Sequence, residues 1–463
     1  MRKPIIIGLV FILLLAACSS VTPAPTQAPT HAPTAQPTSP PQTTPIKTTE
    51  ITWFVHLDDA EQKWQTEVII PAFQKKFPAI RVSLFVASEN DFDTKLLALA
   101  AAGKTPDIWS HWGTMGFQEY VRRGLVADLT PYVSKDNYDL ADFQPEVLET
   151  YRLDGKLYGL PMQANGSFII YNKDLFDKAG VAYPPTNWED AGWTYDKFLE
   201  TCKALTQIKN NAATDVYGCD LNLNPEDAYA WLFGKDLYPD TAYKTGFATQ
   251  SFLDDPQVIK AYQARQDLPW SLKYQPDQAT ADKLRVGGDL FANGRVAMVL
   301  AGGWNLSTYL AQVRTFKWGV AALPAAAANR RGVIYSDPWM LSAKSEHPQE
   351  AWTFLKYLLE APQQEAWMNL SKAAPTRKSL LDKWAAQFTS MKPDEVKQVV
   401  LGAYKYGRET PAHMLVKYNL LEPLLRNAAE PILQNKMKPA DVLVETRKKL
   451  DSALQQIQAE FKK

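Results

Sequence analysis

The sequence predicts an α/β protein with two lobes, and two observations support that prediction. β-rich runs alternate with amphipathic helical patterns, which is typical of layered sheets and helices. The folded part, residues 50–463, also exceeds the roughly 250–300 residues that one hydrophobic core usually serves. We therefore expect mixed, mostly parallel sheets with helices on both faces.

The first elements follow a β-α-β-α-β order. Strands are expected at residues 51–55, 81–86 and 105–109. Two helices lie between them: one carries Trp64 and Phe73 near one face and is interrupted by Pro71, and the other covers residues 92–102. In a parallel sheet of this kind, ligands gather beyond the carboxyl ends of the strands.

Later elements carry their own start signals and apolar patterns. Thr194 is expected to cap a helix over residues 195–206, and Pro348 stands near the first turn of another helix. Continuous apolar runs indicate buried strands, and a final apolar stripe indicates a C-terminal helix. These elements are expected at residues 296–300, 318–322 and 443–461.

The N-terminus reads as an export signal. Two basic residues precede an apolar run at residues 5–15, which is too short to span a membrane, and small residues with Cys18 follow it. The segment resembles a bacterial lipobox, which implies cleavage before Cys18 and lipid on that residue. An ordinary cleaved signal with an incidental cysteine is the alternative. Residues 1–17 are then the signal peptide.

Residues 18–49 are expected to form a disordered tether. From Val21 to Thr49 the chain is almost entirely Pro, Thr, Ala, Gln and Ser, with Lys47 its only Lys or Arg. Such a segment cannot bury enough apolar surface to offset its ordering entropy. Its prolines favour an extended form at about 3.1 Å per residue, which suits a spacer between membrane and body.

Composition excludes some classes of function. The chain has 50 basic and 50 acidic residues without a Lys/Arg run, so a nucleic-acid surface is not expected. Fourteen tryptophans are many for this length, and aromatic rings are the usual platform for sugar faces or bases. Cys202 and Cys219 either form a disulfide or remain two buried thiols. Neither a structural metal nor a cofactor is expected.

Several segments together resemble the extracellular solute-binding proteins of bacterial ABC importers, in the branch with the maltose- and multiple-sugar-binding proteins. The clearest is Gly-Lys-Leu-Tyr-Gly-Leu-Pro at 155–161, followed by Tyr-Asn-Lys-Asp-Leu-Phe at 171–176. The order and spacing of these segments extend over nearly all of residues 50–463. The others are residues 105–109, 291–300, 302–304, 318–324, 337–342, 351–355 and 374–377.

The resemblance implies a two-lobed periplasmic-binding-protein fold with a hinged cleft that closes on a solute. The chain would cross between lobes near residues 161–166, 335–337 and 374–377. Lobe 1 would hold about residues 50–161 and 336–373, and lobe 2 about residues 162–335 and 374–463. The implied partners are an ABC permease and, through the lipid, the membrane; a monomer is expected.

The first site candidates follow strands. Trp304 comes after Gly302-Gly303, and relatives often place an aromatic there against a sugar ring. Two glycines would let the backbone approach the ligand, although a core tryptophan beside a turn is the alternative. His111 and Trp112 follow the third strand and are candidates for the same cleft or for packing.

The crossovers supply the next candidates. Asn165 stands where some relatives carry a carboxylate, and its amide can still bind hydroxyls; Gln163 is its neighbour. Asp337 and Trp339 form an acid–aromatic pair, with a turn-capping role as the alternative for the aspartate. Arg377 is either a ligand donor or a member of a hinge ion pair.

The remaining candidates are Glu89 and His56, which lie just past strands, and Trp231 in the second lobe. Asn90 is a neighbouring candidate. Aromatic and neutral or acidic groups favour a carbohydrate ligand. A polyamine or a glycerol phosphate is an alternative, although a phosphate would require more clustered cations than Arg377 alone.

Three rival classes stay open. A cell-surface glycoside hydrolase would also be rich in tryptophan and would need two paired carboxylates, but the chain has no short catalytic motif. A surface sensor or adhesin could use the same fold without an importer. A metal receptor would have to rely on His56 and His111. We expect a binding protein rather than an enzyme.

Overall fold

A computed structural model describes residues 47–56, 59–110, 115–209, 214–221, 226–285 and 288–461. The predicted signal peptide, Cys18 and most of the predicted tether lie outside this range, as do His111 and Trp112. Among the described residues, no helix combines the length and the apolar character needed to cross a bilayer.

Three parallel strands form one end of the sheet, which we call its first half. They are β1 (Thr49–Val55), β2 (Ile80–Val86) and β3 (Ile108–Trp109), with β1 between the other two. Helix α3 (Glu89–Ala101) lies between β2 and β3 in the chain and is capped by the Ser88 side chain. The predicted β-α-β-α-β order of this region is confirmed, although β3 is shorter than expected.

The other end of the sheet, its second half, contains β8 (Val296–Gly302), β7 (Tyr217–Asp220) and β9 (Trp318–Ala321). β7 pairs with β8 in parallel, while β8 and β9 both run antiparallel to one long strand. The sheet is therefore mixed, and the expectation of mostly parallel pairing holds for the β2-β1-β3 end and for β7 with β8, but not for the strands between them.

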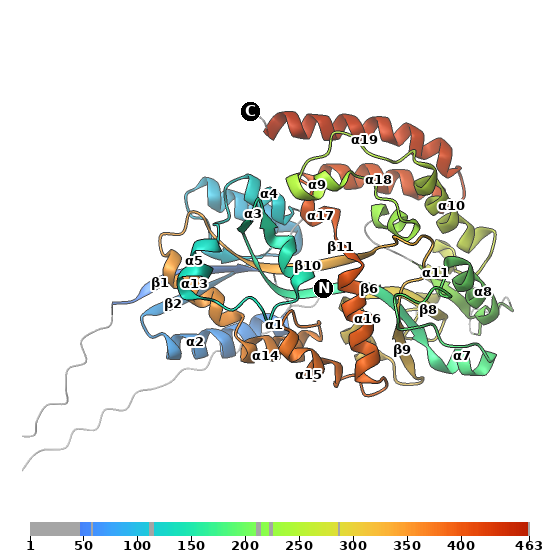
Figure 1. Cartoon of the computed structure of the whole chain (residues 1–463), viewed down its shortest axis with the longest axis horizontal. Helices are drawn as coiled ribbons and strands as arrows, with labels where there is room; N and C mark the ends of the chain where they lie inside the picture. The colour runs from blue at the N-terminus through green and yellow to red at the C-terminus, as the bar shows by residue number, and fades with distance from the viewer. Residues whose placement is uncertain are drawn as a thin grey trace, which may run out of the picture. The chain divides into compact units, whose positions relative to one another are not determined.

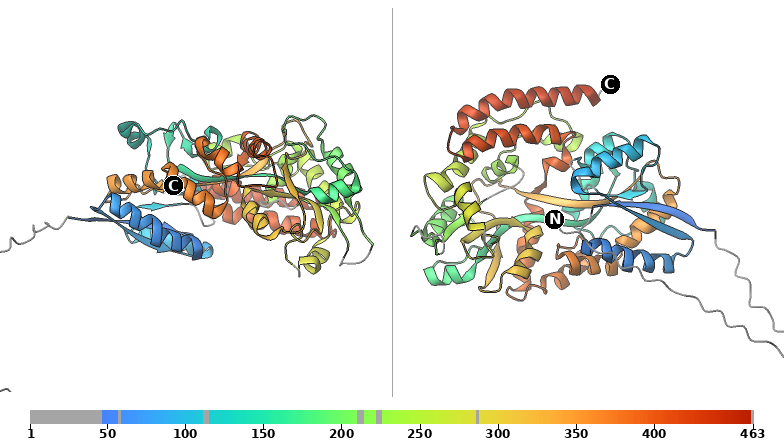
Figure 2. Two further views of the ribbon diagram at one scale, coloured as in Figure 1. Left: turned by 90° about the horizontal axis from the view of Figure 1, so that it is seen from below. Right: turned by 180° about the vertical axis from the view of Figure 1, so that it is seen from behind.

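Two long strands, β6 (Leu160–Asn172) and β10 (Gly332–Leu341), join the halves and are called here the crossing strands. They pair antiparallel with each other. β10 pairs with β3 at its end and β6 with β8 and β9 at its end, so the sheet is continuous through them (Figures 1 and 2). β11 (Gly407–Glu409) pairs with β10.

Helices pack on this sheet from several parts of the chain. Helix α13 (Pro348–Leu358) contacts β1 and β10, and α16 (Pro393–Lys405) packs on β6, β10 and β11. The C-terminal helices α18 (Tyr418–Leu433) and α19 (Pro439–Phe461) lie side by side and contact α10 (Pro256–Trp270) (Figure 1).

The remaining α-helices are short. They are α1 (Asp59–Trp64), α2 (Ile70–Lys76), α4 (Phe117–Arg122), α5 (Thr130–Asp136), α6 (Pro145–Leu148), α7 (Lys173–Ala179), α8 (Tyr195–Leu205), α9 (Asp240–Thr245), α11 (Gln278–Leu284), α12 (Leu306–Gln312), α14 (Ala361–Ser371), α15 (Leu381–Ala385) and α17 (Pro411–Met414). A two-stranded hairpin, β4 (Arg152–Leu153) and β5 (Lys156–Leu157), and the 3-10 turns η2 (Glu149–Tyr151), η3 (Glu226–Phe233), η5 (Gly303–Asn305) and η6 (Lys378–Leu380) complete the fold.

Local signals in the sequence explain several boundaries. A π-helical turn, η1 (Gln65–Ile69), directly precedes α2, and Pro71 stands in the first turn of that helix. Proline lacks an N–H and is tolerated at the start of a helix, so the chain changes its winding there. Thr194 accepts from the Lys197 N–H at 3.1 Å, as expected for the cap of α8.

The two cysteines lie next to each other, one on α8 and one on β7. Both are buried, and the structure has them as free thiols. Burial, followed by the hydrogen bond with Cys219, raises the pKa of Cys202 well above its ordinary value. The suggested disulfide is therefore not present here, and the alternative of two buried thiols describes the structure.

Candidate functional site

The crossing strands place four polar or aromatic side chains on one face of the sheet. Asn165 is the register partner of Tyr335, and Gln163 is the partner of Asp337. Paired residues share a face, and residues two apart on a strand do as well. The candidates Asn165, Gln163 and Asp337 are thus brought together with Tyr335, midway between the halves. We call these four residues the row.

Trp304 stands at the second-half end of this row. Its side chain is 40% exposed, and its ring lies so close to Gly302 that a Cβ there would stand 2.2 Å from a ring carbon. A Cβ on Gly303 would stand 2.5 Å from Asn165 Oδ1. The two glycines therefore seat the indole and the amide against one turn, and a larger residue at either position would have to displace them.

The Asn165 amide is an unusual group in this setting. The residue is only 7% exposed, and its Oδ1 accepts no hydrogen bond from the described residues. A buried oxygen without a donor costs free energy, so such groups often mark a place where a ligand or water supplies the donor. Asn165 and Trp304 together offer one acceptor and one apolar ring.

A second aromatic contact continues the row. The rings of Trp304 and Tyr335 meet edge to face with centroids 5.3 Å apart, and His413 of α17 lies 5.9 Å beyond Tyr335. His413 Nδ1 is 2.7 Å from Glu409 Oε1. Ser336 Oγ donates to Glu409 Oε2 at 2.5 Å, and Tyr151 Oη lies 2.6 Å from Ser336 Oγ. This network fixes His413 beside the row.

The charge of His413 follows from its surroundings. Its side chain is 13% exposed. Burial lowers the pKa of His413 to about 4, although the nearby Asp337 opposes that change. His413 is therefore a neutral imidazole at pH 7, which suits contact with an uncharged ligand.

The first-half end of the row carries two more tryptophans. Gln163 Nε2 donates to Asp337 Oδ2 at 2.6 Å, and its Oε1 accepts from Trp367 Nε1 at 2.9 Å. Trp367 packs against Trp64 with ring centroids 5.7 Å apart. Gln163 and Asp337 thus form a hydrogen-bonded pair that links both crossing strands to α14.

Two crossover candidates serve packing or the hinge. Trp339 is 2% exposed and packs edge to face on Trp53 in the core, so it offers no ring to a ligand. Arg377 forms an ion pair with Asp142 at 3.0 Å and covers the ring of Phe143. For Arg377 the structure agrees with the alternative of an ion pair rather than a ligand donor.

The remaining candidates lie elsewhere or outside the description. Trp231 is almost fully buried; it lines a cavity of about 260 Å³ together with Lys235 and Arg331. His56 is half-buried just after β1. Glu89 begins α3, and its side chain is not described, nor are His111 and Trp112.

Four residues of this face were missed by sequence reasoning: Tyr335, His413, Trp64 and Trp367. Tyr335 lies within the predicted second crossover, so that signal was available. Trp64 was assigned to a helix face, and nothing in the sequence around His413 or Trp367 marks them. Their positions depend on α14 and α17 folding back onto the crossing strands.

The described side chains of the site are suited to binding an uncharged ligand. Among the described residues, no group of three or more His, Cys, Asp or Glu side chains could hold a metal ion. The carboxylates of Asp337 and Glu409 already accept hydrogen bonds from Gln163 and Ser336. Exposed and half-buried rings beside neutral amides can bind an uncharged ligand that has both apolar faces and hydroxyls.

Comparison with known families gives the class of this protein. Residues 69–394 match the model of the family described as bacterial extracellular solute-binding protein. This match extends over more than half of the chain, and the chain belongs to that family. It is therefore an extracellular solute-binding protein, and the family is not one of enzymes.

Individual relatives are distant. A putative binding protein of Brucella abortus is 26% identical over 401 residues, which cover 84% of this chain and 89% of the relative. The multiple sugar-binding protein of Streptococcus mutans is 25% identical over 302 residues, covering 63% of this chain and 67% of the relative.

Solved structures show the same fold. The sugar-binding protein MalE from Xanthomonas citri has a TM-score of 0.71 at 20% identity, over 90% of this chain and 100% of that one. An ABC substrate-binding protein from Listeria monocytogenes, solved with cycloalternan, has a TM-score of 0.70 at 23% identity, over 88% and 99% of the two chains. The predicted periplasmic-binding-protein fold is confirmed.

Proposed function

We propose that this protein is the sugar-binding component of an ABC importer and that it takes an oligosaccharide on the face of the crossing strands. The observation that supports this best is the half-exposed Trp304 ring seated beside the Asn165 oxygen, which has no donor among the described residues. A sugar ring has an apolar face for the indole and hydroxyls for the amide, so it satisfies both.

The relatives support a carbohydrate. Those at similar distance include a multiple sugar-binding protein, a lactose-binding protein of Rhizobium radiobacter and a maltotriose-binding protein of Pyrococcus abyssi. Aromatic rings occur at both ends of the row, the exposed Trp304 at one and the half-buried Trp64, which packs on the buried Trp367, at the other. Such spacing favours a ligand longer than one sugar ring.

In our proposal the two groups of strands belong to lobes that close about the crossing strands. Lobe 1 has about residues 50–161 and 336–373, and lobe 2 about residues 162–335 and 374–463. A permease can then distinguish the loaded shape from the empty one. Residues 1–17 are removed, Cys18 carries lipid, and the tether up to residue 49 holds the body off the membrane.

The test is a thermal-shift screen of the exported protein against maltose, maltotetraose, cycloalternan, lactose and monosaccharides. Spermidine, glycerol 3-phosphate and Zn²⁺ serve as controls. A ligand that binds only the folded state stabilises that state by about 2.7 kcal/mol at about 100 times its Kd, which raises Tm measurably. We expect a shift with a glucose oligosaccharide and recovery of that sugar uncleaved.

Other results would overturn parts of the proposal. A shift with spermidine or glycerol 3-phosphate but with no sugar would keep the receptor and replace its ligand. A sugar that is recovered cleaved would favour a glycoside hydrolase. For the anchor, the wild type should incorporate labelled palmitate in the producing cells and Cys18→Ser should not, and labelling of the variant to the wild-type level would contradict lipidation of Cys18.

A further inference from the structure

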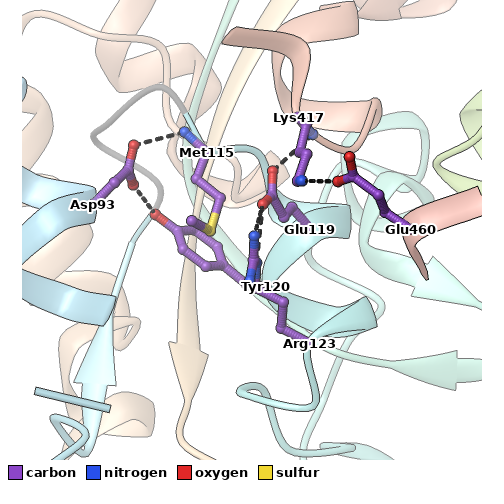
Figure 3. Close-up of polar contacts among 7 residues, drawn as sticks. All are labelled: Asp93, Met115, Glu119, Tyr120, Arg123, Lys417 and Glu460. Carbon is purple, nitrogen blue, oxygen red and sulfur yellow. Dashed lines mark hydrogen bonds and ion pairs between the residues drawn. The ribbon is translucent and has the colours of Figure 1, made fainter. Parts of the chain in front are cut away.

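Helix α4 connects the first half of the sheet to the C-terminal helices through polar side chains. Glu119 is 3% exposed, and its Oε2 accepts the backbone N–H of Lys417 at 2.8 Å (Figure 3). The buried Gln118 donates to the Tyr243 carbonyl, and Arg122 donates to the Lys244 carbonyl at 3.2 Å. A buried polar group is costly when it is unpaired, so the contacts of Glu119 and Gln118 favour one relative position of the two regions.

Each side of this contact is fixed to a different part of the sheet. On one side, Asp93 of α3 accepts from Met115 N and Tyr120 Oη, both at 2.7 Å, which holds α4 to the first half (Figure 3). On the other side, Lys417 precedes α18, which packs on α10 and η3 of the second-half region. Glu119 therefore bridges the two halves.

The chemistry of Glu119 suits this role. Its Oε1 accepts from Arg123 Nε at 2.9 Å, which leaves Oε2 for Lys417. Lys417 has a left-handed φ of 54° at the N-terminal end of α18, where a negative charge is favoured by the helix dipole. Besides the ion pair of Glu119 with Arg123, the Lys417 side chain forms an ion pair with Glu460 of α19 (Figure 3).

The contact between Glu119 and Lys417, called here the bridge, is directly connected to the face of the crossing strands that we propose binds the ligand. The segment just before Lys417 is α17, which carries His413. The backbone carbonyls of Ala412 and His413 approach Gly116, the first residue before α4, so closely that a Cβ there would be 2.4 Å from either oxygen. A movement of α4 away from α17 would therefore change the position of His413 relative to Trp64 and Trp367.

We propose that Glu119 is a positioning residue, which holds α17 and its His413 against the first half of the sheet in the arrangement that binds ligand. The part of this inference that concerns affinity rests on the proposed function. If the binding arrangement is populated only in part, the apparent Kd rises by the inverse of that fraction.

The test compares Glu119→Gln and Gly116→Ala with the matched control Glu422→Gln. The first change presents an NH₂ group either to the Arg123 guanidinium or to the Lys417 backbone N–H, both of which now donate to Glu119. The second change pushes α4 from α17 with a methyl group while Glu119 is retained. Glu422 forms an exposed pair with Arg426 at 3.4 Å. Small-angle scattering of the ligand-free protein and maltotetraose affinity by calorimetry are the two measurements.

We expect both variants to be more expanded than the wild type when free, to bind at least about five-fold more weakly, and to regain the wild-type scattering profile with saturating sugar. The control should behave as the wild type. Unchanged scattering in both variants, or expansion without a change in Kd, would overturn the proposal. If the wild type binds no sugar, the proposed function fails. The scattering of the ligand-free variants then still shows whether Glu119 holds α17 against the first half of the sheet. If Glu119→Gln does not fold, Glu119→Asp replaces it in the same two measurements, because the shorter side chain keeps the charge but draws the carboxylate back from the Lys417 N–H.

Discussion

Two tryptophans near the crossing strands, Trp304 and Trp339, lie in opposite environments. Trp304 is 40% exposed and rests on a glycine turn, whereas Trp339 is 2% exposed and packs on Trp53. Both follow or occupy strands of the same sheet. The difference shows that a tryptophan beside a strand stays available to a ligand where it rests on a glycine turn at the surface, and is unavailable where it packs into the core.

The polar groups near each ring differ in the same way. Beside Trp304, the Asn165 oxygen accepts no hydrogen bond from the described residues. On the Trp339 side, Gln163 has both of its amide atoms engaged, by Asp337 and by Trp367. We therefore expect changes near Trp304 to alter binding and changes at Trp339 to alter stability.

The largest expected effect is on stability, from Trp339→Ala. Removal of a buried tryptophan leaves a cavity, and such changes cost about 3–5 kcal/mol. Urea denaturation should give that loss in the free energy of unfolding. A loss below about 1 kcal/mol would mean that Trp339 is not a core residue, which would remove the contrast with Trp304.

The next effect is the pH dependence of stability due to His413. Burial lowers the pKa of His413 to about 4 in the folded state, from about 6.5 in the unfolded state. The unfolded chain then binds more protons between these values, so stability falls as the pH decreases from about 6.5 to about 4. Between about pH 7 and about pH 5 this contribution is about 2 kcal/mol.

Denaturation of the wild type and of His413→Gln at a series of pH values measures this effect. Glutamine cannot take up the proton, so the variant should lose about 2 kcal/mol less over that range. Parallel curves for the two proteins would show that His413 titrates normally, in the presence of Glu409 and Asp337, and that it is not the buried neutral group described above.

A smaller effect is expected on binding from Trp304→Ala. The stacking contact of an aromatic ring is worth more than about 1 kcal/mol with the apolar area it buries, which is about a five-fold rise in Kd. Stability should stay within about 0.5 kcal/mol, since the ring is exposed. Titration calorimetry with maltotetraose measures the change, and an unchanged Kd would remove Trp304 from the site.

The fold could be predicted from the sequence more fully than the site. The strands at residues 51–55 and 296–300 and the cap at Thr194 follow from local patterns, and so they were found. Trp304 and Trp339 each stand beside a strand signal, and local pattern gives no way to tell which is buried. The positions of His413 and Trp367 depend on long-range folding of α17 and α14, for which the sequence has no local signal.

The smallest expected effect tests the glycine seat itself, with Gly302→Ala. The new methyl group would stand 2.2 Å from the Trp304 ring, so the indole must move. The ring itself is unchanged and can still contact a sugar. Because the ring is exposed and has room to rotate, we expect a loss in binding free energy of about half that of Trp304→Ala, roughly 0.5 kcal/mol. In the double variant with Trp304→Ala the alanine should add nothing further, since its only effect is on the ring. Additive losses in calorimetry would instead mean that Gly302 contacts the ligand through its own backbone. The glycine would then be needed for close approach of the ligand and not for placing the indole.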